Sequence, residues 1–380
     1  MASMLSEISV AGFKSLRDVT LDLQPMNILI GANGAGKSNL LSLFKLVSEV
    51  VGGTLQNYVA ASGGADHLLY FRKKTTRELS IRFKSGTSLI YECRLVPTEE
   101  DRLFFADERY GVEGERVLLH GGHFESKMLK PPPRRSDGKT PYAAQRFQKS
   151  LRDLMYGRAV YHFHDAGYTA AMRATAKTDD NRILRSDGSN LAPFLYWLKE
   201  KHDLEHRRVS DAVRLVAPFF KDFALSPLKL APETIKLEWE EVGDEGYRDA
   251  SDLSDGTLRF MCLATLLLQP QPPGLILIDE PELGLHPYAI GILAELLRAA
   301  SRRSQIIVSS QSSALVNHFK PEDVIVVERK RENGQTFESS GRQETVFKRL
   351  DTPSLEQWLE DYELGDLWEK NLLGGRPTYA

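Results

Sequence analysis

The segment Gly31-Ala32-Asn33-Gly34-Ala35-Gly36-Lys37-Ser38 decides the fold, because it matches the phosphate-binding pattern G-x-x-x-x-G-K-[ST] without interruption. An apolar run at residues 26–30 precedes it, and apolar residues at helical spacing follow it up to the stop signal Gly52-Gly53. Strand, loop and helix therefore occur in the order that a nucleotide site requires. We predict that backbone N–H groups and the helix N-terminus bind phosphates, that Lys37 reaches the β/γ oxygens and that the Ser38 hydroxyl ligates Mg²⁺.

The composition is that of an ordinary globular protein: 380 residues, 42% hydrophobic and 27% charged, with a net charge of -3. This charge excludes a generally basic nucleic-acid-binding chain but says nothing about local patches. No apolar run approaches the roughly 20 residues of a membrane-spanning helix, and residues 1–7 lack the basic and apolar regions of a signal peptide. We therefore expect a cytoplasmic protein with no membrane segment, whose native start is either Met1 or Met4.

Alternating apolar and polar residues predict an antiparallel sheet beside the nucleotide core. The alternation occurs at residues 8–16, 19–23, 79–83 and 89–96. It makes the chain unlike a plain Rossmann fold.

The rest of the chain is predicted to be mixed. Helical spacing occurs at residues 189–201 and 209–220, a β-pair is predicted at residues 225–230 and 234–239, and a hairpin at residues 324–327 and 345–347. From Thr352 onward we predict an acidic helical tail, which either packs on its own head or docks a partner.

A basic stretch lies at residues 127–158, where Pro131-Pro132-Pro133 predicts a loop that leads into a helix near Ala143. Its candidates for contact with the phosphates of DNA or RNA are Arg134, Arg135, Lys139, Arg146 and Lys149. A solvated basic surface explains these side chains equally well, because the whole chain is slightly acidic.

Histidines and cysteines raise the question of a metal site. In a strand His162 and His164 share one face, but no second paired ligand motif lies nearby, so we favour structural or surface histidines. Cys93 and Cys262 lie in apolar surroundings far apart in the sequence, and we predict buried free thiols.

The apolar run at residues 275–278 is typical of a strand buried on both faces, and it ends in Asp279-Glu280. Carboxylates at the carboxyl end of such a strand lie where open α/β sheets bind ligands. We predict that Asp279 holds Mg²⁺ directly or through water and that Glu280 polarises the attacking water. Asp-Glu-Pro is also a good helix start, but the phosphate loop in the same chain favours the catalytic interpretation.

Three further polar segments lie at the ends of core elements. Leu253-Ser254-Asp255-Gly256-Thr257 precedes an apolar helix and is a candidate anion-binding turn, although Ser-Asp-Gly is common turn chemistry. Leu283-Gly284-Leu285-His286-Pro287 opens the next helix, and Ser309-Ser310-Gln311-Ser312 follows a buried strand.

Together with Phe13-Lys14-Ser15, these segments resemble in their order the ATP-binding-cassette (ABC) ATPases of the RecF, SMC and OLD-like group, over nearly the whole chain. The resemblance implies an α/β ABC-ATPase head with a P-loop mixed-sheet core, a flanking antiparallel sheet and a helical signature lobe. It divides the chain into the first part of the ATPase lobe (1–140), a basic linker with the signature lobe (141–268), the second part of the ATPase lobe (269–350) and a helical tail (351–380).

The resemblance also implies roles for the matching residues. In this family two heads sandwich two molecules of ATP with Mg²⁺, so a homodimer is expected on ATP binding. Residues 31–38 and Asn39 of one chain bind ATP and face the signature residues 253–257 of the other. The implied catalytic residues are Lys37, the general base Glu280 and the switch residue Gln311; the implied metal ligands are Ser38 and Asp279; and residues 283–287 form the dimer-facing D-loop.

The sequence departs from the family pattern at two positions. Asp255 stands where transporters usually have glycine, and Gln311 where many relatives have histidine. Glutamine hydrogen-bonds a γ-phosphate but does not titrate near neutral pH, so we expect slow turnover. The Q-loop glutamine is undecided among Gln56, Gln145 and Gln148. The sequence contains no long heptad segment and no Toprim-like acidic cluster after Lys320.

By analogy with these relatives, we expect a DNA-associated ATPase of repair or anti-phage defence that works with a separately encoded nuclease or Toprim-like effector. Two alternatives stay open. One is the ATPase subunit of a membrane transporter, which residues 12–15, Asp255 and Gln311 disfavour. The other is a low-turnover, ATP-dependent regulatory scaffold that binds a partner protein.

Overall fold

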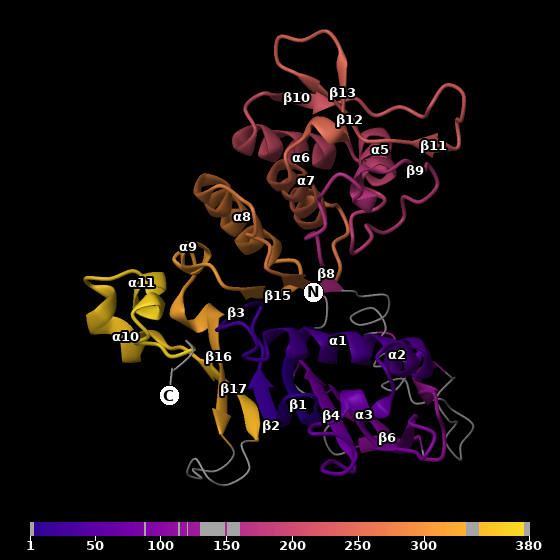
Figure 1. Cartoon of the computed structure of the whole chain (residues 1–380), viewed down its shortest axis with the longest axis vertical. Helices are drawn as coiled ribbons and strands as arrows, with labels where there is room; N and C mark the ends of the chain where they lie inside the picture. Colours follow the sequence, from indigo (N-terminus) through magenta and orange to yellow (C-terminus); the bar gives the residue numbers. More distant parts are fainter. Residues whose placement is uncertain are drawn as a thin grey trace. The chain divides into compact units, whose positions relative to one another are not determined.

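The computed structural model (Figure 1) describes residues 4–86, 89–112, 115–119, 121–129, 149, 160–331 and 342–375. The chain forms two compact units. The first consists of Met1–Ala159, Pro273–Ile276 and Lys320–Ala380, and the second of Val160–Pro272 and Leu277–Phe319. Each unit is therefore built from segments that are far apart in the sequence.

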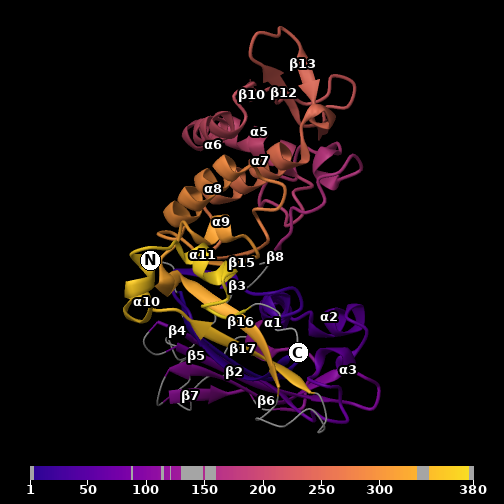
Figure 2. The ribbon, with the colours of Figure 1, turned by 60° about the vertical axis from the view of Figure 1, so that its left-hand side comes forward.

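The first unit contains the predicted antiparallel sheet, with strand order β2-β1-β4-β5-β6-β7. Its strands are β1 (Leu5–Phe13), β2 (Leu16–Asp22), β4 (Leu79–Ser85), β5 (Leu89–Pro97), β6 (Leu103–Val112) and β7 (Glu115–Leu118). Side chains along β4 alternate between buried and partly exposed, as the period of two predicts. Figure 2 shows these strands, in indigo and violet, within one sheet.

A mixed sheet in the same unit carries the phosphate loop. Strand β16 (Val324–Arg331) pairs in parallel with β3 (Met26–Ile30) and antiparallel with β17 (Gln343–Arg349), which confirms the predicted hairpin. All five residues of β3 are buried. A core strand therefore leads directly into the loop.

Helix α1 (Lys37–Gly52) follows the loop and buries one side against the unit. Its buried residues include Leu40, Leu41, Phe44 and Val47, which are the positions that the helical spacing selects. The helix ends at Gly53, whose φ of 71° lies in the left-handed region that glycine adopts without strain. Two short helices, α2 (Leu55–Ala61) and α3 (Ala65–Leu68), follow and were not predicted.

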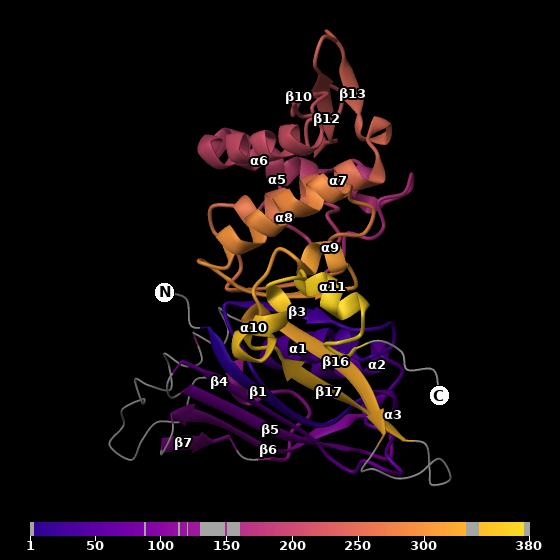
Figure 3. The ribbon, with the colours of Figure 1, turned by 90° about the vertical axis from the view of Figure 1, so that its left-hand side faces the viewer.

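The C-terminal tail packs on the first unit. It forms α10 (Thr352–Leu359) and α11 (Leu364–Glu369), with Leu367 and Trp368 buried. After the helices, the Gly375 N–H donates to Glu328 Oε1 of β16 at 2.6 Å. Figure 3 shows both helices beside β16. The tail is thereby part of the head, as one of the two alternatives predicted.

The second unit combines a small parallel sheet with a helical layer. Its sheet strands are β8 (Val160–Tyr161), β14 (Leu275–Asp279, from Leu277 onward) and β15 (Gln305–Ser310), and its helices are α5 (Leu191–Lys201), α6 (Asp203–Val216), α7 (Asp255–Leu268), α8 (Pro287–Ala300) and α9 (Ser313–Val316). Helices α6, α7 and α8 pack on one another (Figure 3). Buried Cys262 lies in α7 and buried Cys93 in β5; both are free thiols, as predicted.

The β-pair predicted at residues 225–230 and 234–239 was wrong in its first strand. Instead β10 (Phe220–Phe223) pairs with β12 (Glu238–Glu241), and β12 pairs with β13 (Tyr247–Asp249). The other short strands, β9 (Ala176–Lys177) and β11 (Thr234–Ile235), pair with each other. Prolines explain the error: Pro218 ends the helical segment early enough for β10 to form, and Pro227 lacks the N–H that a strand at residues 225–230 would need.

Candidate nucleotide site

The phosphate loop runs between β3 and α1 in the first unit, and close packing makes one of its glycines obligatory. Gly36 has a φ of 117°, and a Cβ built on it would lie 2.2 Å from Thr345 Oγ1. No side chain fits there without moving β17. The loop backbone is consequently held against the sheet.

Side chains of the loop divide into buried and exposed ones. Lys37 is only 5% exposed, and its ammonium group donates to the carbonyl oxygens of Gly31 and Ala32, so its charge lies over the loop. Asn33, Gly34 and Ser38 are exposed. The loop therefore presents backbone groups and one hydroxyl to solvent beside a fixed cation, which suits a phosphate.

Side chains from outside the motif hold the loop in place. Asn39 Nδ2 donates to Ser15 Oγ at 2.6 Å, Thr345 Oγ1 donates to Ala35 O at 2.9 Å, and the Ser15 and Thr345 hydroxyls are hydrogen-bonded to each other at 2.7 Å. The predicted Phe13-Lys14-Ser15 segment is thus connected to the loop. The role of Thr345 was not predicted, because its approach depends on how β17 pairs.

Two further contacts reach the loop from late in the chain. Arg329 Nε donates to Gly34 O at 3.0 Å, and the Ala32 N–H donates to Gly375 O at 2.7 Å. Gly375 has a φ of 82° and would place a Cβ 2.9 Å from Val326. Neither contact can be predicted from the local sequence, although Gly374-Gly375 indicates a turn.

The predicted catalytic carboxylates lie in the second unit at the carboxyl end of β14. Asp279 Oδ1 accepts from the Ser309 hydroxyl, and the Glu280 N–H donates to Ser309 O at 2.8 Å. Glu280 has a φ of 41°, a left-handed conformation that is uncommon outside glycine. The end of β15 therefore fixes both the backbone and a side chain at the end of β14.

Gln311, the predicted switch residue, contacts the predicted general base directly. Its side-chain Nε2 donates to Glu280 Oε1, and its backbone N–H donates to Glu282 Oε1 at 3.1 Å. Glu282, which the sequence analysis did not single out, also accepts from Ser310 Oγ at 2.6 Å. The switch segment and the carboxylates form one hydrogen-bonded group.

Glu282 is a buried carboxyl group, only 9% exposed. Burial raises its pKa above the ordinary 4.5, and the hydrogen bonds from Ser310 and Gln311 offset only part of that effect. Within the described residues, its Oε2 atom has no hydrogen-bond partner.

The signature segment forms the turn before α7, as predicted. The Ser254 hydroxyl caps the helix by accepting from the Thr257 N–H at 3.1 Å, and Leu253 is buried while Ser254 and Asp255 are exposed. Arg173, which was not predicted, donates to Asp255 Oδ1 at 2.8 Å and to the carbonyl oxygen of Leu253 at 3.1 Å. The turn is therefore held rigidly with its polar residues facing outward.

The predicted D-loop packs against the signature helix within the second unit. A Cβ on Gly256 would lie 2.5 Å from Gly284 O, and a Cβ on Gly284, whose φ is 75°, would lie 2.9 Å from Arg259 Nη1. Leu283 and His286 are exposed. Two segments that are distant in the sequence thus share one surface.

Most of the remaining predicted residues lie outside the part of the chain that the structure describes. Arg134, Arg135, Lys139 and Arg146 lie outside the described residues, as do the loop at Pro131-Pro132-Pro133, Gln145 and Gln148; Lys149 is described and is exposed. Gln56 donates to the carbonyl oxygens of Leu103 and Phe124 beside the antiparallel sheet.

Comparison with known proteins identifies the family and the fold. The sequence matches the family described as "AAA domain, putative AbiEii toxin, Type IV TA system" over residues 26–317. The structure resembles the Smc head bound to the C-winged helix domain of ScpA, with a TM-score of 0.59, 16% identity, and coverage of 92% of this chain and 99% of that one. It also resembles the ScpA-bound Smc head domain from Pyrococcus furiosus, with a TM-score of 0.52, 16% identity, and coverage of 94% and 98%. The predicted ABC-ATPase head fold is confirmed, and the chain shares it with the Smc heads.

Curated relatives match shorter parts of the sequence. The phosphate import ATP-binding protein PstB 1 of Synechococcus sp. (strain JA-3-3Ab) is 38% identical over 85 residues, which are 21% of this chain and 30% of the relative. A Methanosarcina acetivorans ABC transporter ATP-binding protein is 32% identical over 126 residues, which are 30% of this chain and 45% of the relative. The match spans less than half the length of both relatives. Among the described residues, no helix is both long and apolar enough to cross a membrane.

The raised pKa of Glu282 predicts a pH-dependent stability. Because the folded state holds this proton more tightly than the unfolded chain, the contribution is fully present below pH 4.5 and is lost as the pH rises through the folded pKa. Urea unfolding of the wild type and of Glu282→Gln between about pH 4.5 and pH 8 measures it. We expect the free energy of unfolding of the wild type to fall relative to the variant as the pH rises.

Glu295→Gln is the matched control, since the Glu295 side chain is 68% exposed on α8. It controls for the general effect on the free energy of unfolding of replacing one glutamate by glutamine. If the free-energy difference between the wild type and Glu282→Gln changes with pH no more than that of the control, burial does not perturb this carboxyl group.

Proposed function

The chain belongs to the AAA-domain family that matches residues 26–317, and from this membership we propose that it binds and hydrolyses ATP as a cytoplasmic ABC-type ATPase. The observation that carries the proposal is the phosphate loop. Its backbone is locked by Thr345, its cation Lys37 lies over the loop, and its polar tip is exposed. This is the geometry that a nucleoside triphosphate needs for its phosphates.

The proposed roles follow from where each side chain is held. Residues 31–39 bind ATP, and Lys37 neutralises the terminal phosphates. Ser38, an exposed hydroxyl, and Asp279, a partly exposed carboxylate, are the oxygen donors that would hold Mg²⁺. Bound Mg²⁺ neutralises charge on the phosphate oxygens.

Glu280 is the proposed general base. Gln311 Nε2 donates to Glu280 Oε1, which leaves Glu280 Oε2 as the oxygen that would accept a proton from the attacking water. Gln311 remains neutral over the physiological pH range, so it orients but does not transfer a proton. We propose slow turnover for this reason.

We further propose that ATP closes a homodimer. Ser254 and Asp255 are exposed at the N-terminus of α7, and the D-loop beside them is exposed as well. The positive end of the helix dipole at Ser254 suits the γ-phosphate bound to the partner copy. One ligand would then contact both chains, and its binding energy would couple them.

For the biological role, we propose a DNA-associated ATPase of repair or anti-phage defence that acts with a separately encoded nuclease or Toprim-like effector. The family description, which mentions a toxin of a type IV toxin–antitoxin system, and the basic residues 134–149 support a role outside transport. A low-turnover, ATP-dependent regulatory scaffold that binds a partner protein is an alternative to this role, and the non-titrating Gln311 favours its slow turnover.

The transporter relatives support a second candidate, an ATP-binding subunit of an importer. Their names describe phosphate import and ABC transport. The early Gly12-Phe13-Lys14-Ser15 segment, Asp255 and Gln311 argue against it, because they depart from the transporter pattern. Co-purification with membranes would favour this candidate.

Glu280→Gln is expected to retain ATP and to accumulate as a closed dimer. The amide cannot accept the proton of the attacking water, so hydrolysis should fall by about 10²–10⁴-fold while the phosphate loop is unchanged. Size-exclusion chromatography with light scattering in saturating Mg-ATP measures the mass. Lys37→Ala should lose nucleotide binding and stay monomeric.

Glu295→Gln, which removes an exposed carboxylate of α8, controls for a general effect of losing charge. It should turn over ATP and dimerise only transiently, as the wild type does. A Glu280→Gln protein that remains monomeric in saturating Mg-ATP would contradict the proposed switch.

A DNA role predicts that DNA stimulates hydrolysis. Replacing Arg134 and Arg135 by glutamine should remove the stimulation, because the phosphate contacts are lost, and added salt should weaken it in the wild type. Rates without DNA normalise the comparison, and gel shifts with and without ATP report binding. Hydrolysis that does not respond to DNA would count against this role and leave the transporter and scaffold candidates.

A further inference from the structure

Two histidines that the proposed ATPase mechanism does not use lie beside Asp279. Strand β8 pairs in parallel with β14, with Leu277 opposite Val160 and Ile278 opposite Tyr161. The next residues along these strands are Asp279 and His162. The carboxyl ends of neighbouring parallel strands meet at one edge of the sheet, where α/β proteins bind ligands.

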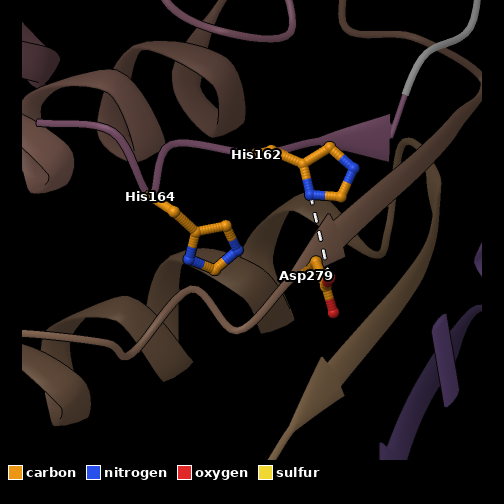
Figure 4. Close-up of side chains that lie close together, drawn as sticks. All are labelled: His162, His164 and Asp279. Atoms are coloured by element: carbon orange, nitrogen blue, oxygen red, sulfur yellow. Dashed lines mark ion pairs between the residues drawn. The ribbon is translucent and has the colours of Figure 1, made fainter. Parts of the chain in front are cut away.

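Figure 4 shows His162, His164 and Asp279 facing one another. One ligand atom from each side chain lies within 4.8 Å of the ligand atoms of the other two. His162 Nδ1 is 3.7 Å from Asp279 Oδ2, and the two imidazole ring centroids are 5.9 Å apart. The His162 side chain is 51% exposed and that of Asp279 17% exposed, so a dissolved ion can reach the cluster.

The surrounding structure orients these three groups. Ser309 donates to Asp279 Oδ1, which leaves Oδ2 on the side of His162. Buried Arg259 donates to Phe163 O at 2.8 Å and to His164 O at 2.9 Å, and so fixes the backbone that carries both histidines. Hydrogen bonds to a ligating carboxylate and a rigid backbone beside the ligands are the outer contacts that metal sites use.

We propose that His162, His164 and Asp279 bind one divalent transition-metal ion of the first row, of the kind represented by Zn²⁺ and Co²⁺. Two imidazole nitrogens and one carboxylate oxygen suit these ions, whereas Mg²⁺ takes oxygen ligands. Three protein ligands leave at least one position for water or for a phosphate oxygen, as in catalytic zinc sites.

The cluster needs only a small contraction to bind such an ion. Ligand atoms that each lie about 2.0–2.2 Å from a tetrahedral zinc ion are about 3.4 Å apart, compared with the 4.8 Å limit of the cluster. The half-exposed His162 ring is the ligand that would rotate to shorten these distances.

The inference does not rest on ATP hydrolysis, although it shares Asp279 with the proposed Mg²⁺ site. All three ligands belong to the second unit, and the phosphate loop belongs to the first. Metal binding is therefore measured on the full chain without nucleotide. Its failure and the failure of the proposed ATPase function would be seen in different experiments.

The test is a titration of the untagged, EDTA-stripped protein with CoCl₂, in which the visible absorption of bound Co²⁺ is measured. ZnCl₂ is then added to displace the bound Co²⁺. We expect one equivalent of Co²⁺ to bind and Zn²⁺ to displace it, with excess Mg²⁺ unable to do so. His162→Gln, His164→Gln and Asp279→Asn should each weaken binding by at least about tenfold.

His318→Gln is the matched control, because His318 lies in the same unit but outside the cluster, and Lys37→Ala tests independence from the nucleotide loop. Both should bind Co²⁺ as the wild type does. Circular dichroism melting confirms that each variant is folded. Because each ligand has its own variant, the test still stands if one of the three variants does not fold. Absence of saturable binding, or binding that survives His162→Gln combined with His164→Gln, would show that His162 and Asp279 form an ion pair only.

Discussion

The site depends on hydrogen bonds that hold three carboxylates within four positions of the chain. Asp279, Glu280 and Glu282 would repel one another if they were free to move. Each accepts instead from residues 309–311: a serine hydroxyl for Asp279, the glutamine amide for Glu280, and a hydroxyl with a backbone N–H for Glu282. The end of β15 therefore sets the direction of every acidic group at the end of β14.

The same principle extends through the second unit. Arg173 fixes the signature turn that precedes α7. Arg259, in the first turns of α7, fixes the backbone that carries His162 and His164 and lies against Gly284. Each arginine donates to backbone carbonyl oxygens of the segment that it fixes. The signature turn, the D-loop and the end of β14 are consequently parts of one rigid assembly, so a ligand that moves one of them would move the others.

Much of this arrangement follows from local sequence signals. The strand before the phosphate loop, the helix after it, the buried strand ending in Asp279-Glu280 and the hairpin of β16 and β17 were predicted, because period, glycine and capping residues act over a few positions. The strand predicted at residues 225–230 does not form, because Pro227 has no N–H to donate to a neighbouring strand.

The unpredicted contacts are those that tertiary pairing creates. Thr345 and Gly375 reach the phosphate loop from more than 300 positions away in the sequence, a separation at which no local pattern operates. His162 and His164 looked isolated, since their third partner, Asp279, is provided by the parallel pairing of β8 with β14. Burial of Glu282 likewise depends on packing and not on its neighbours in the sequence.

The central claim is that each ATP site is shared between two copies of the chain, and a mixing experiment tests it most directly. Lys37→Ala removes the phosphate-loop cation, and Ser254→Arg blocks the exposed signature turn. Each variant alone should be inactive, while an equimolar mixture should recover roughly a quarter to a half of the wild-type ATPase rate, since each mixed dimer would hold one intact site and neither variant closes a productive dimer with itself. A mixture no more active than its two components, or full activity of Ser254→Arg alone, would contradict the shared site.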